Sequence, residues 1–368
     1  MSYLIDEGQN IQHLLMGNEA IVRGALEAGV NIAAGYPGTP SSEIIESFSK
    51  VAKERNLYVE WSTNEKVAVE VAAAGSFAGL RSLCVMKQNG VNVASDFLLH
   101  LASSGTRGGM LLVSCDDPGA LSSVNEGESR LFARLLEIPL LEPGDFQEAK
   151  DIIPWAFELS EEIRNIVMIR SVTRLSHASG NVRFGPLPDT AARAVFNYSG
   201  PLLDPDTGPV ISMILAAPEL QHGPQLEKLK KAAEIFETCP FNTYTGPDAP
   251  ELLIITSSAC SLYSREAVAI LGLEKRVGIL KLATTWPLPR RLLTGHLART
   301  ARILFVEEVA PTLEDHVKII AAETAAEIGV KTFYGKKSGH LPAVGELNPD
   351  LVINALAGLL AISYQPLT

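Results

Sequence analysis

The stretch Gly35-Tyr36-Pro37-Gly38-Thr39-Pro40-Ser41-Ser42-Glu43 follows an apolar run at residues 30–34 and precedes a helix-like run at residues 42–51. This order predicts a turn from a strand to a helix, which is where open α/β sheets bind their ligands. Two prolines fix φ and a glycine allows positive φ, so the turn should be stiff and specifically shaped. The chemistry alone fits an ordinary strand-to-helix turn equally well. The phosphate-binding patterns GxxxxGK[ST] and GxGxxG do not occur in it.

A second informative stretch begins at Asn64-Glu65-Lys66, where a long helix of small residues is predicted for residues 65–78. A carboxylate in the first turn of a helix often does no more than complement the helix dipole. The alternative is functional: Glu65 is held against a ligand nitrogen in a dry interface, since the small residues let a second helix approach closely. A loop rich in Thr and Ser beside a single acid suits a polar organic cofactor better than a phosphate.

Two further polar stretches follow predicted strands and are therefore expected at the same edge of the sheet. Residues 87–92, Lys-Gln-Asn-Gly-Val-Asn, fit either a ligand-facing segment or a turn with a helix N-cap. Asp116-Asp117-Pro118-Gly119 ends the strand predicted at residues 109–115. Two adjacent acids before proline fit a metal site, but such sequences more often form a turn.

Helical and strand patterns alternate along most of the chain, which predicts parallel α/β sheets. The predicted strands are residues 30–34, 57–61, 82–87, 109–115, 140–141, 167–171, 252–256, 277–282, 303–307 and 332–334. The predicted helices are residues 17–28, 41–55, 65–78, 93–104, 125–136, 145–163, 221–238, 262–271, 290–299, 313–328 and 348–360. Residues 175–207 are rich in Gly, Pro, Ser and Asn and lack periodicity, which predicts a linker that wraps the surface.

The composition describes a globular protein with a large core, since 46% of the 368 residues are hydrophobic and only 20% are charged. A net charge of −11 argues against nucleic acid as a partner, because nucleic-acid binding needs a basic face. No apolar run reaches the roughly 18 residues of a membrane span. Residues 1–12 lack the apolar core of a signal peptide. We therefore expect a cytoplasmic protein that contacts neither nucleic acid nor membrane.

The four cysteines, Cys84, Cys115, Cys239 and Cys260, are widely separated and form no CxxC motif. This spacing excludes a contiguous iron–sulfur or zinc motif within these residues. Three of the four lie in or at the ends of predicted apolar strands, where buried free thiols are expected. Buried free thiols agree with a reducing cytoplasm.

Several stretches together resemble one family. Residues 35–44 (GYPGTPSSEI), residues 60–96, DDPG at residues 116–119 and NEGESR at residues 125–130 resemble the pyrimidine-binding domain of 2-oxoacid:ferredoxin oxidoreductases. The indolepyruvate ferredoxin oxidoreductase α subunits are the most similar branch. LATTWPLP at residues 282–289, residues 303–317 and HLPAVGELNPD at residues 340–350 resemble the transketolase C-terminal-like domain of those subunits.

The resemblance implies a fold class and domain boundaries. We expect two doubly wound, mainly parallel-sheet α/β domains. Residues 1–178 are expected to form the pyrimidine-binding domain for thiamine diphosphate, and residues 249–368 the transketolase C-terminal-like domain. Residues 179–248 are expected to form a linker and a connecting helix.

The resemblance also implies a cofactor and site residues. In this family a glutamate hydrogen-bonds N1′ of the thiamine diphosphate aminopyrimidine and so activates the coenzyme, and Glu65 matches it. Thr39 matches a loop threonine near the thiazolium and the substrate. The other cofactor-binding residues that the resemblance implies are Tyr36, Pro37, Gln88 and Asn89. Glu65 must share a proton with the ring nitrogen, which requires a dry environment, and we expect a partner chain to provide it. No metal ligand is expected in this chain.

Full-length α subunits of this family continue into a diphosphate-binding domain with a GDG-like, Mg²⁺-ligating motif and a cysteine-rich, ferredoxin-like tail. These 368 residues contain neither, and their Gly144-Asp145 pair is followed by Phe146 with no Asn-Asn pair downstream. We therefore expect a partner chain that binds the diphosphate and Mg²⁺. Iron–sulfur clusters are expected only in partner subunits, with a ferredoxin-type redox subunit among them, in a dimer of heteromers.

The expected reaction is the oxidative decarboxylation of an arylpyruvate, such as indolepyruvate, to an acyl-CoA or an acid. Two alternatives remain open at this point. The domain order also fits the β subunit of a 2-oxoacid dehydrogenase complex, which shares the glutamate chemistry. The second alternative is a non-catalytic scaffold that kept the fold. In that case Glu65 would be exposed to water in the assembled complex.

Overall fold

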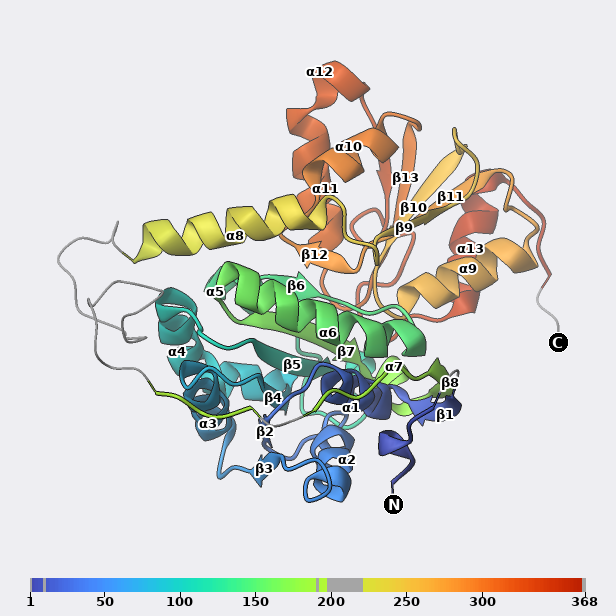
Figure 1. Ribbon diagram of the computed structural model, residues 1–368. Helices are drawn as coiled ribbons and strands as arrows, with labels where there is room; N and C mark the ends of the chain where they lie inside the picture. The colour runs from blue at the N-terminus through green and yellow to red at the C-terminus, as the bar shows by residue number, and fades with distance from the viewer. Residues whose placement is uncertain (1, 9–10, 190–191, 197–220, 366–368) are drawn as a thin grey trace.

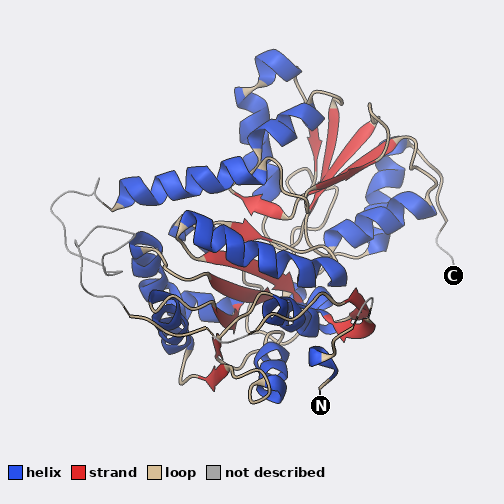
Figure 2. Ribbon diagram, in the orientation of Figure 1, coloured by secondary structure: helices blue, strands red, loops and turns tan. Residues whose placement is uncertain are grey.

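The computed structural model describes residues 2–8, 11–189, 192–196 and 221–365. These residues form two α/β lobes, with the long helix α8 (His222–Phe236) beside their junction (Figure 1). Strands form the interior of each lobe and helices cover them from outside (Figure 2). The predicted two-domain α/β architecture is therefore confirmed.

The first sheet has seven strands in the order β12-β6-β7-β5-β4-β2-β3. They are β2 (Ile32–Gly35), β3 (Tyr58–Trp61), β4 (Ser82–Lys87), β5 (Met110–Asp116), β6 (Leu140–Leu141), β7 (Val167–Val172) and β12 (Thr284–Trp286). Every neighbouring pair is parallel except β12 with β6. The central strands are buried on both faces, which is why β4 and β5 are nearly continuous apolar runs.

Successive side chains of a strand point to opposite faces, so this sheet has two cores. In β4, Leu83 and Val85 pack into one core, and Cys84 and Met86 pack into the other. The first face is covered by α1 (Gly17–Glu27), α2 (Ser42–Val51) and α6 (Phe146–Ile163). The second face is covered by α3 (Glu65–Phe77), α4 (Gln88–Ser104) and α5 (Arg130–Leu136). Helices on both faces make the lobe doubly wound, as predicted.

The second sheet has five strands in the order β14-β13-β10-β11-β9. They are β9 (Thr243–Thr245), β10 (Leu252–Thr256), β11 (Val277–Lys281), β13 (Arg302–Val306) and β14 (Thr332–Tyr334), and β9 alone runs antiparallel to its neighbour. One face packs on α9 (Cys260–Ile270) and α13 (Pro349–Leu360). The other packs on α10 (Arg290–Leu297) and α11 (Thr312–Glu323).

The two lobes share a sheet edge and a core. β12 follows the second lobe's β11 in the chain, yet it pairs with β6 of the first sheet, where Trp286 lies opposite Leu140. The Glu142 N–H donates to the carbonyl of Ala283 at 2.7 Å and extends this joint. The apolar core beneath α1 and α6 continues into the core beneath α9 and α13. The sequence patterns predicted no strand at β12, so this joint is a finding of the structure.

The linker predicted from residue 175 is wrong over its first residues. Helix α7 (Thr173–His177) and strand β8 (Ser179–Arg183) occupy them. β8 pairs antiparallel with β1 (Gln12–Met16), in a small sheet that brings the start of the chain onto the first lobe. A short strand depends on a distant partner more than on its own composition, which is why no local pattern revealed it. Residues 190–191 and 197–207 of the predicted linker lie outside the described residues.

Helix boundaries follow local capping where a cap exists. The side chain of Asn64 accepts the N–H of Val67 at 3.0 Å, and α3 begins next to it as predicted. Asp145 caps α6 in the same way. The helix predicted at residues 313–328 instead breaks at Thr324 into α11 and α12 (Ala325–Ile328). Two short 3₁₀ helices, η1 (Tyr3–Ile5) and η2 (Pro118–Ala120), complete the described elements.

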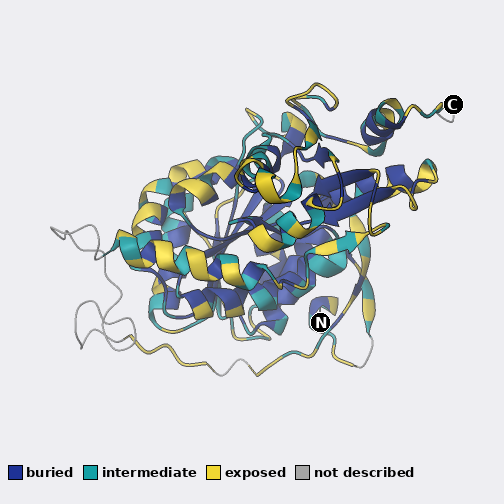
Figure 3. Cartoon of the chain, turned by 90° about the horizontal axis from the view of Figure 1, so that it is seen from above, coloured by how far each residue is buried: buried dark blue, intermediate teal, exposed yellow. Residues whose placement is uncertain are grey.

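Buried residues are concentrated in the strands, and exposed residues lie on outward turns of helices and on loops (Figure 3). All four cysteines are free and buried, as predicted. No helix in the described part of the chain is long and apolar enough to cross a membrane.

Candidate cofactor site

The predicted site lies where β2 and β4 end. The two strands are neighbours in the sheet, with Gly35 opposite Val85 at their carboxyl ends. Helix α2 follows β2 on one face of the sheet, whereas α4 follows β4 on the other face. Neighbouring strands whose following helices diverge in this way form a topological switch point, the place where open α/β sheets bind ligands.

The loop after β2 is held in one conformation by its own hydrogen bonds. The N–H of Gly38 donates to Ser42 Oγ at 2.9 Å, and Ser41 Oγ donates to the Gly38 carbonyl at 2.7 Å. Asn18 of α1 donates to the carbonyl of Pro40 at 2.8 Å, and the Thr39–Pro40 peptide bond is cis. The side chains left exposed by this arrangement are those of Tyr36, Pro37 and Thr39.

Glu65 is the first residue of α3 and is half-buried. Its side chain lies over Gly90 of α4: a Cβ added at Gly90 would be 2.5 Å from Glu65 Cγ and 2.9 Å from Oε1. Burial, together with the nearby Glu65 carboxylate, raises the pKa of the Cys84 thiol in β4. No donor among the described residues hydrogen-bonds the Glu65 carboxylate. The carboxylate is therefore available to a ligand at the edge of the sheet.

Gln88 and Asn89 are helical, so the turn, which was one of the two interpretations of residues 87–92, is not what the structure shows. Helix α4 begins at Gln88, five residues earlier than predicted. Gln88 is buried, and its Nε2 donates to Ser123 Oγ at 3.2 Å. Its Oε1 is buried without a hydrogen-bond partner. Asn89 is half-buried, and its Oδ1 lies beside Gly127.

The structure brings all the predicted site residues to one edge of the first sheet. Lys87, the last residue of β4, connects two of the segments, since a Cβ added at Gly38 would lie 2.9 Å from Lys87 Cδ. Sequence reasoning did not select Lys87 as a site residue. It also missed Ser122 and Ser123, which contact Lys87 and Gln88. The sequence feature that could have identified Lys87 as a site residue was its position at the end of a predicted strand.

The acids that end β5 form a turn and an ion pair, and both find protein partners. Asp117 accepts the Ser122 N–H and the Ser123 hydroxyl, each at 2.8 Å, and so shapes the loop after η2. Asp116 is fully buried and accepts from Arg170 at 2.6 Å. Among the described residues no cluster of acids, histidines and cysteines is arranged to hold a metal ion. The turn interpretation of this motif is therefore the one that the structure supports.

The helix predicted from residue 125 begins only at Arg130, because residues 121–129 form a loop held by the second lobe. Arg130 is buried, and its Nη1 donates to Glu307 at 2.8 Å. Its Nη2 donates to the carbonyls of residues 308 and 310 at 2.5 and 2.8 Å. Glu126 accepts the backbone N–H groups of Gly119 at 2.8 Å and Gly345 at 3.0 Å. The loop that touches Gln88 is thus connected to the second lobe through Glu126 and Arg130.

The same junction contains a buried network of charges. Arg170 donates to Glu142 at 2.7 Å, and Arg130 donates to Glu128 at 2.6 Å. Burial disfavours ionisation of Glu128, but the two guanidinium groups outweigh it and lower its pKa to about 2. Burial dominates at Glu308 and raises its pKa to about 7. The junction therefore contains one carboxylate that stays ionised and one that titrates near neutrality.

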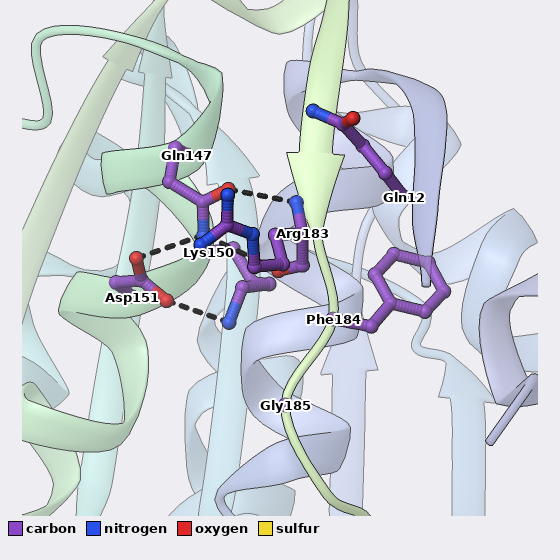
Figure 4. Close-up of a pocket in the computed structure, with 7 residues that line it drawn as sticks. All are labelled: Gln12, Gln147, Lys150, Asp151, Arg183, Phe184 and Gly185. Atoms are coloured by element: carbon purple, nitrogen blue, oxygen red, sulfur yellow. Dashed lines mark hydrogen bonds and ion pairs between the residues drawn. The ribbon is translucent and has the colours of Figure 1, made fainter. Parts of the chain in front are cut away.

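A separate pocket of about 450 Å³ lies between β1, β8 and α6 (Figure 4). It is lined by Gln12, Gln147, Lys150, Asp151, Arg183, Phe184 and Gly185. Lys150 pairs with Asp151 at 2.6 Å, and Gln147 accepts the backbone N–H of Arg183 at 2.7 Å. These polar groups are hydrogen-bonded or ion-paired to one another. None of the predicted site residues lines this pocket.

Comparisons with known proteins show which family the chain belongs to. A family model described as pyruvate flavodoxin/ferredoxin oxidoreductase, thiamine diphosphate-binding, matches residues 23–233. Indolepyruvate oxidoreductase subunit IorA of Pyrococcus horikoshii is 40% identical over 349 residues, which are 95% of this chain and 52% of that protein.

Two solved structures share the fold. A 2-oxoglutarate:ferredoxin oxidoreductase from Magnetococcus marinus aligns over 96% of this chain and 66% of its own, with a TM-score of 0.73 and 16% identity. A split-gene transketolase in an inactive β4 tetramer aligns over 95% of this chain and 99% of its own, with a TM-score of 0.59 and 17% identity. At such low identities these likenesses concern the fold alone.

The fold is therefore a two-lobed α/β fold that is similar to those of a 2-oxoglutarate:ferredoxin oxidoreductase and a split-gene transketolase. The chain belongs to the pyruvate flavodoxin/ferredoxin oxidoreductase family, through its thiamine-diphosphate-binding domain. The family predicted from the sequence motifs is confirmed. The chain spans about half the length of the curated relatives it matches.

Proposed function

We propose that this chain is a subunit of a thiamine-diphosphate-dependent 2-oxoacid:ferredoxin oxidoreductase and that Glu65 activates the cofactor. The supporting observation is the position of Glu65. It is a carboxylate with no donor among the described residues, at the start of α3, in a chain whose family model is thiamine-diphosphate-binding. A carboxyl group at this place can share a proton with the N1′ atom of an aminopyrimidine, whose lone pair accepts the hydrogen bond.

The residues present fit the pyrimidine half of the cofactor. The buried Gln88 Oε1 lacks a partner and supplies an acceptor for an amino group. Gly90 leaves the space that the Glu65 side chain occupies. The exposed side chains of Tyr36 and Pro37 would shape the wall beside the thiazolium, with Thr39 near the thiazolium and the substrate. Asn89 would face the cofactor beside Gln88. When bound, the cofactor supplies the decarboxylation chemistry, and the protein positions and tunes it.

Glu65 has one task in this proposal, which is to hold a proton at the ring nitrogen. Glu65 is only half-buried in this chain, whereas a proton shared with a ring nitrogen calls for a dry environment. A second polypeptide must therefore cover this edge and exclude water. The same polypeptide binds the diphosphate and Mg²⁺, for which these 368 residues contain no motif.

The substrate in this proposal is an arylpyruvate such as indolepyruvate, which is oxidatively decarboxylated. Support comes from the 40% identity to a protein named indolepyruvate oxidoreductase subunit. Electrons pass to a ferredoxin-type acceptor through iron–sulfur partner subunits, in a cytoplasmic dimer of heteromers. Residues 1–178 form the pyrimidine-binding domain, residues 179–248 the connection, and residues 249–368 the transketolase C-terminal-like domain, whose β12 completes the first sheet.

The test is a Glu65→Gln substitution in the complex reconstituted with its partner chain. Glutamine keeps the size of the side chain but cannot exchange a proton, so arylpyruvate-dependent reduction of methyl viologen should fall at least about 100-fold. Glu70→Gln, on the same helix, is the control and should retain turnover. Size-exclusion chromatography verifies that all three complexes assemble. Turnover by the Glu65→Gln complex within a few-fold of the wild type would contradict the proposal.

A further inference from the structure

Lys87 is a cation at the centre of the candidate site with little to hold it there. It is the last residue of β4, between β2 and β5 in the sheet, and directly precedes α4. Its alkyl chain lies across Gly38, where a Cβ would be 2.9 Å from Cδ and 3.0 Å from Cγ. Its Nζ donates to the carbonyl of Ser122 at 3.3 Å. The ammonium group therefore lies between the loop after β2 and the loop after η2.

The charge of Lys87 is not matched by a protein anion. Among the described residues no carboxylate lies within 4.0 Å of its Nζ. By contrast, Lys281 and Lys150 are paired with Glu148 and Glu27. An ammonium group has three donors, and the only described acceptor for Lys87 is one neutral carbonyl. Two donors and a full positive charge remain for a ligand.

Lys87 is the only basic residue in the three segments that meet at this edge. Residues 36–40 and 118–129 contain no Lys, Arg or His, and residues 88–92 contain none either. The two glutamates in residues 118–129 already have hydrogen-bond partners. Glu126 accepts from the Gly345 N–H, and Glu128 accepts from Arg130. The site therefore offers one unpaired positive charge. A single point charge matches a monoanion better than a diphosphate, which is commonly bound by several donors and a metal ion.

We propose that Lys87 binds the carboxylate of the 2-oxo acid substrate and so selects for an anionic substrate. This inference rests on the proposed function, because it assumes that the substrate reacts beside Thr39 and Glu65. The loop after β2 carries Thr39 one residue from the glycine on which Lys87 lies. A substrate that reacts at that loop has its carboxylate within the range of a flexible four-carbon side chain.

The proposal predicts a particular kinetic signature. The substrate carboxylate is negative before the carbon–carbon bond breaks and leaves as neutral CO₂. The carboxylate keeps most of its charge until that bond is largely broken, so an ammonium group stabilises the bound substrate and the transition state by similar amounts. Loss of Lys87 should raise KM for a 2-oxo acid about 10- to 100-fold, the range expected for a charge-assisted hydrogen bond, and should change kcat by less than about threefold.

The experiment uses the reconstituted complex with Lys87→Met and Lys87→Arg, and Lys275→Met as a charge-matched control on the exposed surface of the second lobe. Phenylpyruvate is the substrate. Calorimetry measures binding of two probes of similar shape, 3-phenylpropionate and the neutral 3-phenylpropanamide. We expect the wild type and Lys275→Met to prefer the carboxylate about 10-fold or more. Lys87→Met should lose this preference, and Lys87→Arg should retain most of it.

Lys87 could instead bind the diphosphate of the cofactor, and titration with thiamine diphosphate distinguishes this from binding of the substrate carboxylate. Unchanged cofactor affinity in Lys87→Met, together with lost carboxylate preference, supports the proposal. Weakened cofactor binding with an intact preference for 3-phenylpropionate overturns it, as does an unchanged KM. Lys87→Arg keeps the test decisive if the Lys87→Met complex fails to assemble. An assembled Lys87→Arg complex that shows no preference for 3-phenylpropionate over the amide also overturns the proposal. If the wild type does not turn over phenylpyruvate or indolepyruvate, the proposed function fails instead.

Discussion

At the scale of the residue, Glu308 shows how burial makes a carboxyl group sensitive to pH. It lies at the junction of the lobes, where Oε1 accepts the Leu347 N–H at 3.3 Å. Burial raises its pKa to about 7 from 4.5, because the low-dielectric interior disfavours the charged form. Glu308 therefore contributes stability that is complete below about pH 4.5 and is lost as the pH rises through 7.

Replacing Glu308 by Gln should stabilise the protein at pH 8.5 and have little effect at pH 5. Glutamine resembles the protonated carboxyl group, and its oxygen can still accept from Leu347. The difference between the two pH values should be about 3 kcal/mol in the free energy of unfolding. Chemical denaturation at both pH values measures it, with the exposed Glu274→Gln as control. Equal effects of Glu308→Gln at both pH values would show that this group does not titrate as proposed.

At the scale of the element, the contact between α3 and α4 positions the carboxylate of the site. Gly90 is buried in the first turn of α4, and Glu65 begins α3. An added Cβ at Gly90 would also lie 3.0 Å from Met86 Cβ, so it has no free direction. The glycine therefore determines where the Glu65 side chain can lie.

A Gly90→Ala substitution should reduce turnover of the reconstituted complex about 10- to 100-fold, because displacement of a positioned group by about 1 Å has effects of this size. Stability should change little, because the gain in helix propensity of up to about 1 kcal/mol offsets the strain. Gly358→Ala in α13 is the matched control, since its added Cβ would meet no atom within 4 Å. It should stabilise the chain without a change in turnover. Wild-type turnover by Gly90→Ala would refute this role of the glycine.

At the scale of the whole molecule, the second lobe supports the site of the first. β12 extends the first sheet, and Arg130 and Glu126 connect the loop beside Gln88 to residues 307–310 and 345. The candidate site thus depends on both lobes although its predicted cofactor-binding residues all lie in the first.

This chain alone should bind thiamine diphosphate weakly or not at all. The aminopyrimidine would find Glu65, but the diphosphate and Mg²⁺ would stay in water without protein ligands. Calorimetry with the chain alone and with its partner chain measures the difference. Addition of the partner should bring the cofactor affinity into the micromolar range. Micromolar binding by the chain alone would contradict a divided site.

Much of the fold and part of the site could be predicted because the signals are local. The strands at residues 82–87 and 252–256 agree with β4 and β10, since a buried parallel strand is a short apolar run between polar turns. The strand at residues 332–334 agrees with the edge strand β14. Asn64 caps α3 through its own side chain, so the place of Glu65 at a helix start was readable from the neighbouring residues.

The amino-acid sequence by itself determined the alternation of strands and helices, the stiff loop after β2 and the place of Glu65, because periodicity, proline geometry and capping act between neighbours. Only the tertiary structure decided that α4 begins at Gln88, that β12 joins the first sheet, and that Lys87 lies on Gly38 with no carboxylate of the described residues within 4.0 Å. These features depend on contacts between residues far apart in the chain. Such contacts form when the whole chain packs, so no local pattern contains them.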